Sequence, residues 1–188
     1  MTDQTWVLPL LTFLPLVGAV VMMLLVPKEA ESTHKLIALV SSLAAAALGV
    51  ALFASFNYDA SKDLQFVVDQ AWIPRIGSRF IMGVDGISLP LIGLTLFVIP
   101  LVVIYSWDHI PNPGNPKAFL SLILILETGM LGSFVAQDLI LFFVFYVAIA
   151  VLYASRQAPR LKHYVDGTLV FGTPLAAFGL QYGIVHDK

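Results

Sequence analysis

One acidic side chain, Glu127, lies deep inside a stretch of apolar residues, and it is the residue best placed to do chemistry. It follows Lys117 by ten positions, which in an α-helix is about 15 Å and therefore close to the middle of a bilayer core. A carboxylate at that depth costs about 2.5–3.5 kcal/mol on insertion scales, and the cost falls if the group is protonated, faces another helix or touches water. Glu127 is therefore a candidate proton relay. The alternative interpretation is a protonated side chain that only forms a hydrogen bond to a neighbouring helix.

The residues after Glu127 are mostly small. Gly129 and Ser133 are four positions apart, a pattern that lets a second helix approach closely within a membrane. We expect a packing face here, which would keep the Glu127 carboxyl away from lipid.

Other kinds of chemistry are absent from the sequence. The chain has no cysteine, which excludes disulfides, thiolate metal sites, iron–sulfur clusters and cysteine nucleophiles. The histidines fall in predicted loops or in the tail and form no i, i+4 pair, so we expect solvated side chains rather than metal ligands. No phosphate-binding loop, nucleophile elbow or zinc-protease motif is present. We expect no metal and no cofactor; the histidines are His34, His109, His163 and His186.

The composition indicates lipid as the solvent of this chain. Of its 188 residues, 59% are hydrophobic and only 12% are charged, whereas soluble domains carry about 25% charged residues. The mean hydropathy is +0.88. Ten Lys and Arg stand against twelve Asp and Glu, so no basic patch suggests binding of nucleic acid.

The apolar runs predict an all-α membrane protein. A spanning helix needs about 20 mostly apolar residues, and five runs satisfy this length, with a sixth interrupted by glycines and Pro174. The first run lacks a preceding positive residue and exceeds a signal-peptide core, so we interpret it as a retained span. The five predicted spans are 6–26, 36–56, 87–107, 118–136 and 139–155, and the sixth is 168–185.

The longest connection, residues 57–84, predicts a β-hairpin on the membrane surface. Two β-prone runs, 64–68 and 79–82, flank a turn containing Pro74 and Gly77. Ser88 and Pro90 predict the start of the next helix, with Asp85 close to its positive end. Asp138 likewise begins the fifth span as an acid at a helix N-terminus.

The basic residues predict the orientation in a bacterial cytoplasmic membrane, because Lys and Arg favour the inside. Six lie on one side and four on the other, which places the N-terminus and the hairpin loop outside the cell. The inner set is Lys28, Lys35, Lys117, Arg156, Arg160 and Lys162; the outer set is Lys62, Arg75, Arg79 and Lys188.

Three strings in successive spans resemble those of one protein family. They are Gly83-Val84-Asp85-Gly86-Ile87-Ser88-Leu89-Pro90, Leu126-Glu127-Thr128-Gly129-Met130-Leu131-Gly132 and Asp138-Leu139-Ile140-Leu141-Phe142-Phe143-Val144-Phe145. The family is the proton-pumping subunit M of respiratory complex I, the bacterial NADH:quinone oxidoreductase, whose mitochondrial relative is subunit 4. The order of spans and hairpin matches as well, so the resemblance covers residues 1–147.

The resemblance implies an antiporter-like membrane-arm subunit that takes part in proton translocation coupled to quinone reduction. In that family, carboxylates and lysines of successive helices pass protons, and Glu127 falls on the family's fourth-helix glutamate. The family's subunit carries no flavin and no iron–sulfur cluster. The implied partners are the lipid bilayer and other membrane-arm subunits of complex I, with no soluble cofactor.

The chain also departs from this family. After Phe145 the family pattern continues with an aromatic residue and a glutamate, where this chain has Tyr146 and Val147. Parts of residues 148–188 instead resemble an uncharacterised bacterial multi-pass membrane family. We therefore expect an antiporter-like part, 1–147, followed by a divergent segment, 148–188, with a basic loop and a last span, in a truncated subunit that is not competent alone.

Three functions stay open at this point. The first is a transport-coupled subunit that works through Glu127, although independent pumping needs a chain of titratable or hydrated sites and the sequence offers one deep acid and no deep base. The second is a non-catalytic membrane protein, a chimeric or remnant paralogue that serves packing or assembly. The third is a small transporter whose oligomer gathers several copies of Glu127.

Overall fold

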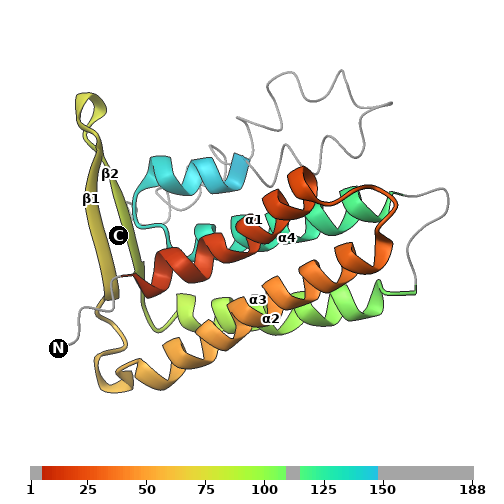
Figure 1. The fold of residues 1–188 in the computed structure, drawn as a ribbon. Coiled ribbons are helices and arrows are strands. Elements are labelled where there is room, and N and C mark those ends of the chain that lie inside the picture. Colours follow the sequence, from red (N-terminus) through yellow and green to blue (C-terminus); the bar gives the residue numbers. More distant parts are fainter. Residues whose placement is uncertain (1–5, 109–114, 148–188) are drawn as a thin grey trace, which may run out of the picture.

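The computed structural model describes residues 6–108 and 115–147. Within them, long helices lie side by side and alternate in direction, and a two-stranded hairpin stands across one end of this bundle (Figure 1). Residues 139–147 form a further helical segment beside the bundle. The long helices are α1 (Val7–Leu25), α2 (Glu31–Ser55), α3 (Ser88–Tyr105) and α4 (Pro116–Val135).

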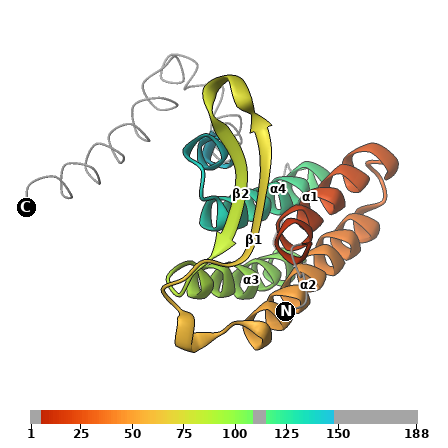
Figure 2. The same cartoon turned by 90° about the vertical axis from the view of Figure 1, so that its left-hand side faces the viewer.

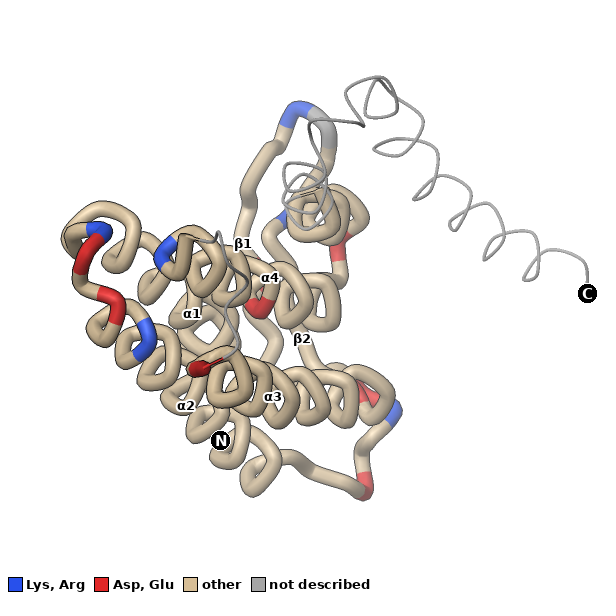
Figure 3. Tube along the Cα trace, turned by 90° about the vertical axis from the view of Figure 1, so that its right-hand side faces the viewer, with Lys and Arg blue, Asp and Glu red and all other residues tan. Residues whose placement is uncertain are grey.

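Each of these helices is long and apolar enough to cross a membrane. The most apolar windows of α1, α2, α3 and α4 have mean hydropathies of 2.4, 2.4, 2.3 and 1.9. Their outer faces carry large apolar side chains, such as Val50 (71% exposed) and Phe97 (67% exposed), which suits contact with lipid. Seen along the helices, the trace is mostly free of charged residues (Figure 3).

The first four predicted spans are confirmed as helices. The helix α2 begins at Glu31, five residues before the predicted span, because Glu31 and Lys35 form an i, i+4 ion pair of 2.7 Å within it. The fifth predicted span is helical over 139–147. The rest of that span and the sixth span, 168–185, lie outside the described residues.

The predicted hairpin is also present, with longer strands than expected. Strands β1 (Gln65–Ile73) and β2 (Ser78–Val84) pair antiparallel, with Val68 opposite Met82. The turn is a short 3₁₀ helix, η2 (Pro74–Ile76), closed by Gly77 at φ 71°, a left-handed conformation that favours glycine. A second 3₁₀ turn, η1 (Tyr58–Ala60), joins α2 to β1.

The hairpin marks one end of the bundle. It crosses the helix ends where α1 and α3 begin and where α2 and α4 finish (Figure 2). The start of α1 and the hairpin therefore lie at the same end of the bundle. Which side of the membrane this end faces stays a prediction.

Candidate functional site: a buried carboxyl between two apolar layers

Glu127 lies inside the bundle, as predicted. Its side chain is fully buried (0% exposed) near the middle of α4. Neither carboxyl oxygen has a hydrogen-bond partner among the residues that the structure describes. Such a group is costly to bury, so its place in the core requires an explanation beyond packing.

Contacts between α1 and α4 fix the depth of Glu127. Lys117 donates from Nζ to the Val26 carbonyl (2.6 Å), and Ser121 donates from Oγ to the Met22 sulfur (3.3 Å). Farther along, Leu124 lies against Gly18. Because α1 and α4 run antiparallel, these pairs follow each other along both helices. The next inward position of α4 is Glu127, which lies opposite the turn of α1 that contains Pro15.

The hydrophobic core is divided in two along the bundle, and Glu127 lies at the division. One cluster includes Leu131 and Val135 of α4 together with hairpin residues. The other includes Leu120, Ile123 and Leu124 of α4 and lies toward the opposite end. Glu127 and Thr128 occupy the interval of α4 between these clusters.

Helix α2 places a polar side chain in the same interval, because Ser42 lies between Ala38 of the second cluster and Ala45 of the first. We name Ser42, Glu127 and Thr128 the polar layer; all are buried. Ser42 and Thr128 donate to carbonyls of their own helices, Leu39 (3.1 Å) and Leu124 (3.1 Å). Thr12 of α1 lies on the hairpin side of this layer, next to Leu11 of the first cluster, and its buried hydroxyl has no partner among the described residues.

Two prolines add polar backbone groups near this layer. Pro15 lies buried within α1 and Pro100 lies buried within α3, beside Ile99 of the second cluster. Proline has no amide hydrogen, so the carbonyl four residues earlier loses its helical donor. The middle of the bundle thus combines a carboxyl, hydroxyls and weakened helix backbone between two apolar layers, which is suitable for accepting and releasing a proton.

One prediction from the sequence is wrong. His34 was expected in a loop with a solvated side chain, but it lies in the first turns of α2 and is fully buried (0% exposed). The reason is the early start of α2, which turns His34 into the bundle. Neither ring nitrogen has a hydrogen-bond partner in the described structure. The other histidines, 109, 163 and 186, lie outside the described residues.

The sequence did contain a signal for this buried histidine. The inward face of α2 has a helical spacing of three or four residues, and His34 continues that series by one turn. The series is His34, Ala38, Ser42, Ala45, Gly49 and Leu52. Extending the helix periodicity through the charged residues 31–35 would have found it.

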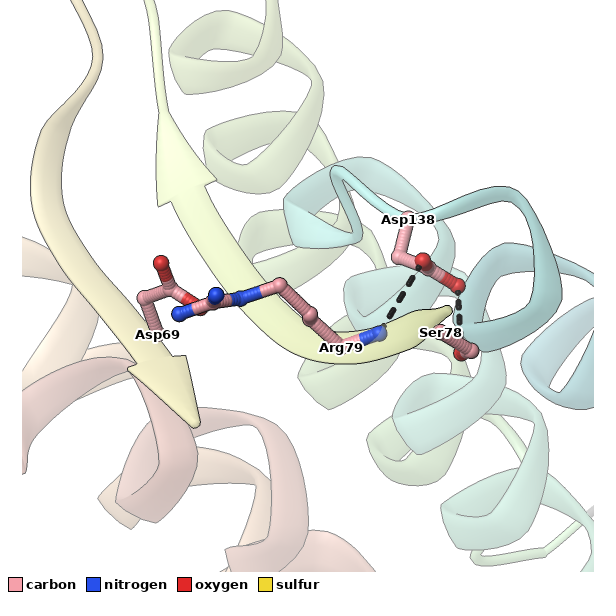
Figure 4. Close-up of polar contacts among 4 residues, drawn as sticks. All are labelled: Asp69, Ser78, Arg79 and Asp138. Atoms are coloured by element: carbon pink, nitrogen blue, oxygen red, sulfur yellow. Dashed lines mark hydrogen bonds and ion pairs between the residues drawn. The ribbon is translucent and has the colours of Figure 1, made fainter. Parts of the chain in front are cut away.

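Asp138 caps the helical segment that follows α4, as predicted. Its Oδ1 accepts hydrogen bonds from the amides of Ile140 (2.9 Å) and Leu141 (3.1 Å). It also binds β2, because Ser78 Oγ donates to Oδ1 (3.1 Å) and the Arg79 amide donates to Oδ2 (3.3 Å), as Figure 4 shows. Desolvation raises the pKa of Asp138, but these hydrogen bonds outweigh it and hold the pKa below its ordinary value.

Asp85 and Ser88 cap α3 reciprocally. The Asp85 carboxylate accepts from the amides of Ser88 (2.7 Å) and Ile87 (3.1 Å), and the Asp85 amide donates to Ser88 Oγ (2.9 Å). The hydrogen bond from the Ser88 amide is the main cause that lowers the pKa of Asp85. Gly86 lies against Ser61, where a Cβ would be 2.9 Å from the Ser61 carbonyl oxygen. These contacts explain the roles of Asp85, Gly86 and Ser88 in the string that starts the third span.

No group of three or more His, Asp or Glu side chains that could hold a metal ion occurs in residues 6–108 and 115–147. The expected absence of a metal and of a cofactor from the whole chain stays a prediction.

Comparison with known proteins places this arrangement in a family. Residues 10–133 match the family described as NADH-ubiquinone oxidoreductase chain 4, amino terminus. The F(420)H(2) dehydrogenase subunit M of Methanosarcina mazei is 37% identical over 102 residues, which are 54% of this chain and 20% of that protein. The NADH-quinone oxidoreductase subunit M of Rhodobacter capsulatus is 36% identical over 144 residues, 75% of this chain and 27% of that protein.

A cyanobacterial relative is matched over more of the chain. The NAD(P)H-quinone oxidoreductase chain 4 1 of Nostoc sp. is 31% identical over 174 residues, 90% of this chain and 32% of that protein. This match reaches beyond residue 147, and the predicted boundary there stays a prediction. The chain spans about a third or less of the length of these relatives. The matched region is the amino-terminal part of these proteins. The chain is a multi-pass membrane protein that belongs to the family of NADH-ubiquinone oxidoreductase chain 4.

Proposed function

We propose that this chain acts as a membrane-arm subunit of an NADH:quinone oxidoreductase and takes part in proton translocation through Glu127. The single observation that carries the proposal is the fully buried Glu127 carboxyl without a partner in the described structure. A structural carboxyl would be expected to have a hydrogen-bond donor or acceptor in the core. A relay group must instead stay free to exchange its proton with other carriers.

The surroundings of Glu127 support this role. The apolar clusters on both sides of the polar layer would keep bulk water away and prevent uncontrolled leakage of protons. Hydroxyls of Ser42 and Thr128 supply polar atoms in the same interval between the two clusters. Together they allow a short chain of hydrogen bonds to form around the carboxyl when the helices shift.

The proposal includes partners and a location. Relatives named as subunits of quinone oxidoreductases support assembly of this chain with other membrane-arm subunits, within the bacterial cytoplasmic membrane. The distribution of Lys and Arg supports an outside location for the N-terminus and the hairpin. Residues 1–147 would form the antiporter-like part, and residues 148–188 a divergent segment.

Val147 stands where the resemblance places the fifth-helix glutamate, so the acidic relay of the family would be incomplete in this chain. We therefore propose that the chain contributes one proton site and depends on partner subunits for the remaining sites. The competing function is non-catalytic packing, which does not require Glu127 to bind or release a proton.

The replacement Glu127→Gln separates the two functions, because glutamine keeps the shape of the side chain but cannot release a proton. The chain is tagged in its native membrane, and two quantities are measured: its migration on a native gel and proton uptake into membrane vesicles driven by NADH oxidation. We expect the variant to migrate with a large complex as the unchanged chain does, while proton uptake per NADH falls.

Glu31→Gln is the matched control, since Glu31 is an exposed residue at the start of α2 that pairs with Lys35. It should leave proton uptake unchanged. If Glu127→Gln assembles normally and retains full proton uptake, Glu127 serves packing and the proposed function is wrong. Migration of the unchanged chain alone would contradict the subunit assignment.

A further inference from the structure

A second buried ionisable group, His34, accompanies Glu127 in the bundle. Among the residues that the structure describes, these two are the only fully buried ionisable side chains. The buried side-chain atoms without a hydrogen-bond partner belong to Thr12, His34 and Glu127. They come from α1, α2 and α4, so the unsatisfied polar groups follow the interior of the bundle.

His34 lies at the end of the bundle opposite the hairpin. It occupies the first turns of α2, near the start of α4, where Lys117 is close enough to act on it electrostatically. The other charged groups that act on the imidazole are Glu29 and Glu31. The Pro27 carbonyl lies near the ring but outside hydrogen-bonding geometry. His34 is thus beside the charged surface of this end, yet shielded from water.

Lys117, which lies near His34, precedes Glu127 by ten residues of α4, so His34 and Glu127 are separated by about 15 Å along the bundle. This distance is too long for direct proton transfer, but buried hydroxyls lie along it. Ser121 follows Lys117 by one turn, and Ser42 follows His34 by two turns on the inward face of α2. Ala38, between His34 and Ser42, has a small side chain.

We propose that His34 is the entry group through which protons from the end opposite the hairpin reach Glu127. One ring nitrogen binds a proton from that surface and the other ring nitrogen releases its own proton inward. The imidazole returns to its neutral state in the other tautomer, and one proton has moved. Ser121, Ser42 and water that enters between them carry the proton to the Glu127 carboxyl. This inference rests on the proposed role of Glu127 as a proton site.

Hydrogen–deuterium exchange of the Glu127 carboxyl tests the route separately from pumping. The whole chain, in the membrane complex with which it purifies, is transferred into D₂O, and infrared spectra are recorded over time. The carboxylic acid band of Glu127 is identified by its absence from Glu127→Gln. We expect His34→Gln to slow the deuterium shift of this band at least tenfold. Asp69→Asn, a change at an exposed hairpin residue that pairs with Arg79, should leave its rate unchanged.

Thr12→Val is the matched control at the other end, because Thr12 is the unpartnered group on the hairpin side of Glu127. It should leave the exchange rate unchanged. If Thr12→Val slows the exchange while His34→Gln does not, the proton enters from the hairpin side and the proposal is wrong. An unchanged rate in both variants would also overturn it.

Two further measurements distinguish an effect on the proton route from a loss of the fold and from a failure of the proposed function. The amplitude of the Glu127 band reports that the fold is intact in each variant; if it is lost in His34→Gln, His34→Asn is used instead. Slow exchange in the His34 variant together with normal proton uptake in Glu127→Gln would confirm the route but refute the proposed function. Reduced pumping in Glu127→Gln together with unchanged exchange in the His34 variant would support the proposed function but refute the route through His34.

Discussion

Replacing Glu127 with leucine tests whether the carboxyl is retained at the expense of the stability of the bundle. The side chain is 0% exposed and both oxygens lack a partner in the described part of the chain. An unsatisfied buried polar group costs about 1–3 kcal/mol, and leucine fills the same space without a polar atom. We therefore expect Glu127→Leu to raise the free energy of unfolding by about 1–3 kcal/mol.

The assay is a titration of the purified chain from a mild detergent into SDS, followed by tryptophan fluorescence. Leu131→Ala is the calibration, because Leu131 is fully buried one turn farther along α4. It should lower the free energy of unfolding by an amount on the order of 2–5 kcal/mol. A decrease of more than about 1 kcal/mol for Glu127→Leu would refute the reasoning, since it would mean that the carboxyl makes a stabilising contact.

The remaining predictions concern the capping acids and the packing of α4. Asp85 and Asp138 have a lowered pKa in the folded chain, so their stabilisation is present above their unfolded pKa of about 3.9 and is lost as the pH falls through the lower folded value. We expect the SDS titration midpoint to be constant from pH 7 to about 5 and to fall below about 4. Asp138→Asn should weaken this fall, and an unchanged profile would contradict the assignment. A Cβ at Gly132 would overlap the Phe145 ring, so Gly132→Ala should destabilise by about 1–3 kcal/mol, and Phe145→Leu in the same chain should recover part of the loss. Equal losses in the single and double variants, measured by the same titration, would argue against this contact.

The membrane-spanning helices could be predicted from the sequence because the length and hydropathy of a run are local properties. The runs that became α1, α3 and α4 were located within two residues at each end. The start of α2 was missed because residues 31–35 carry charges, which a search for apolar runs excludes. In the folded chain Lys35 pairs with Glu31 and lies over the Trp107 ring, 5.9 Å from its centre. This tertiary contact stabilises the first turn of α2 and has no signal in the run itself.

The candidate site was predictable only in part. The depth of Glu127 follows from its distance along the helix, and that prediction needed no knowledge of its neighbours. The lack of a partner for its carboxyl depends on how α1 packs on α4. Gly18 allows α1 to lie close to both α2 and α4, because a Cβ there would collide with the Ser41 side chain of α2 and lie 3.3 Å from Leu124 of α4. The sequence pattern drew attention to Gly129 and Ser133, whereas the close contact with the following helical segment is at Gly132 against Phe145.

The division of the core into two apolar clusters is a reason to regard the polar layer as functional rather than accidental. In a membrane, apolar side chains at every depth would let the helices pack without unsatisfied groups. This bundle instead places Ser42, Glu127 and Thr128 in one interval, with an apolar cluster on each side. Among the described residues, His34 adds a second buried ionisable group without a hydrogen-bond partner, and it lies at the end opposite the hairpin. The buried ionisable groups reach from one end to the middle, and the cluster toward the hairpin contains none. This arrangement suits the proposed route as a half-channel, in which protons enter from one side and, as proposed, leave through a partner subunit.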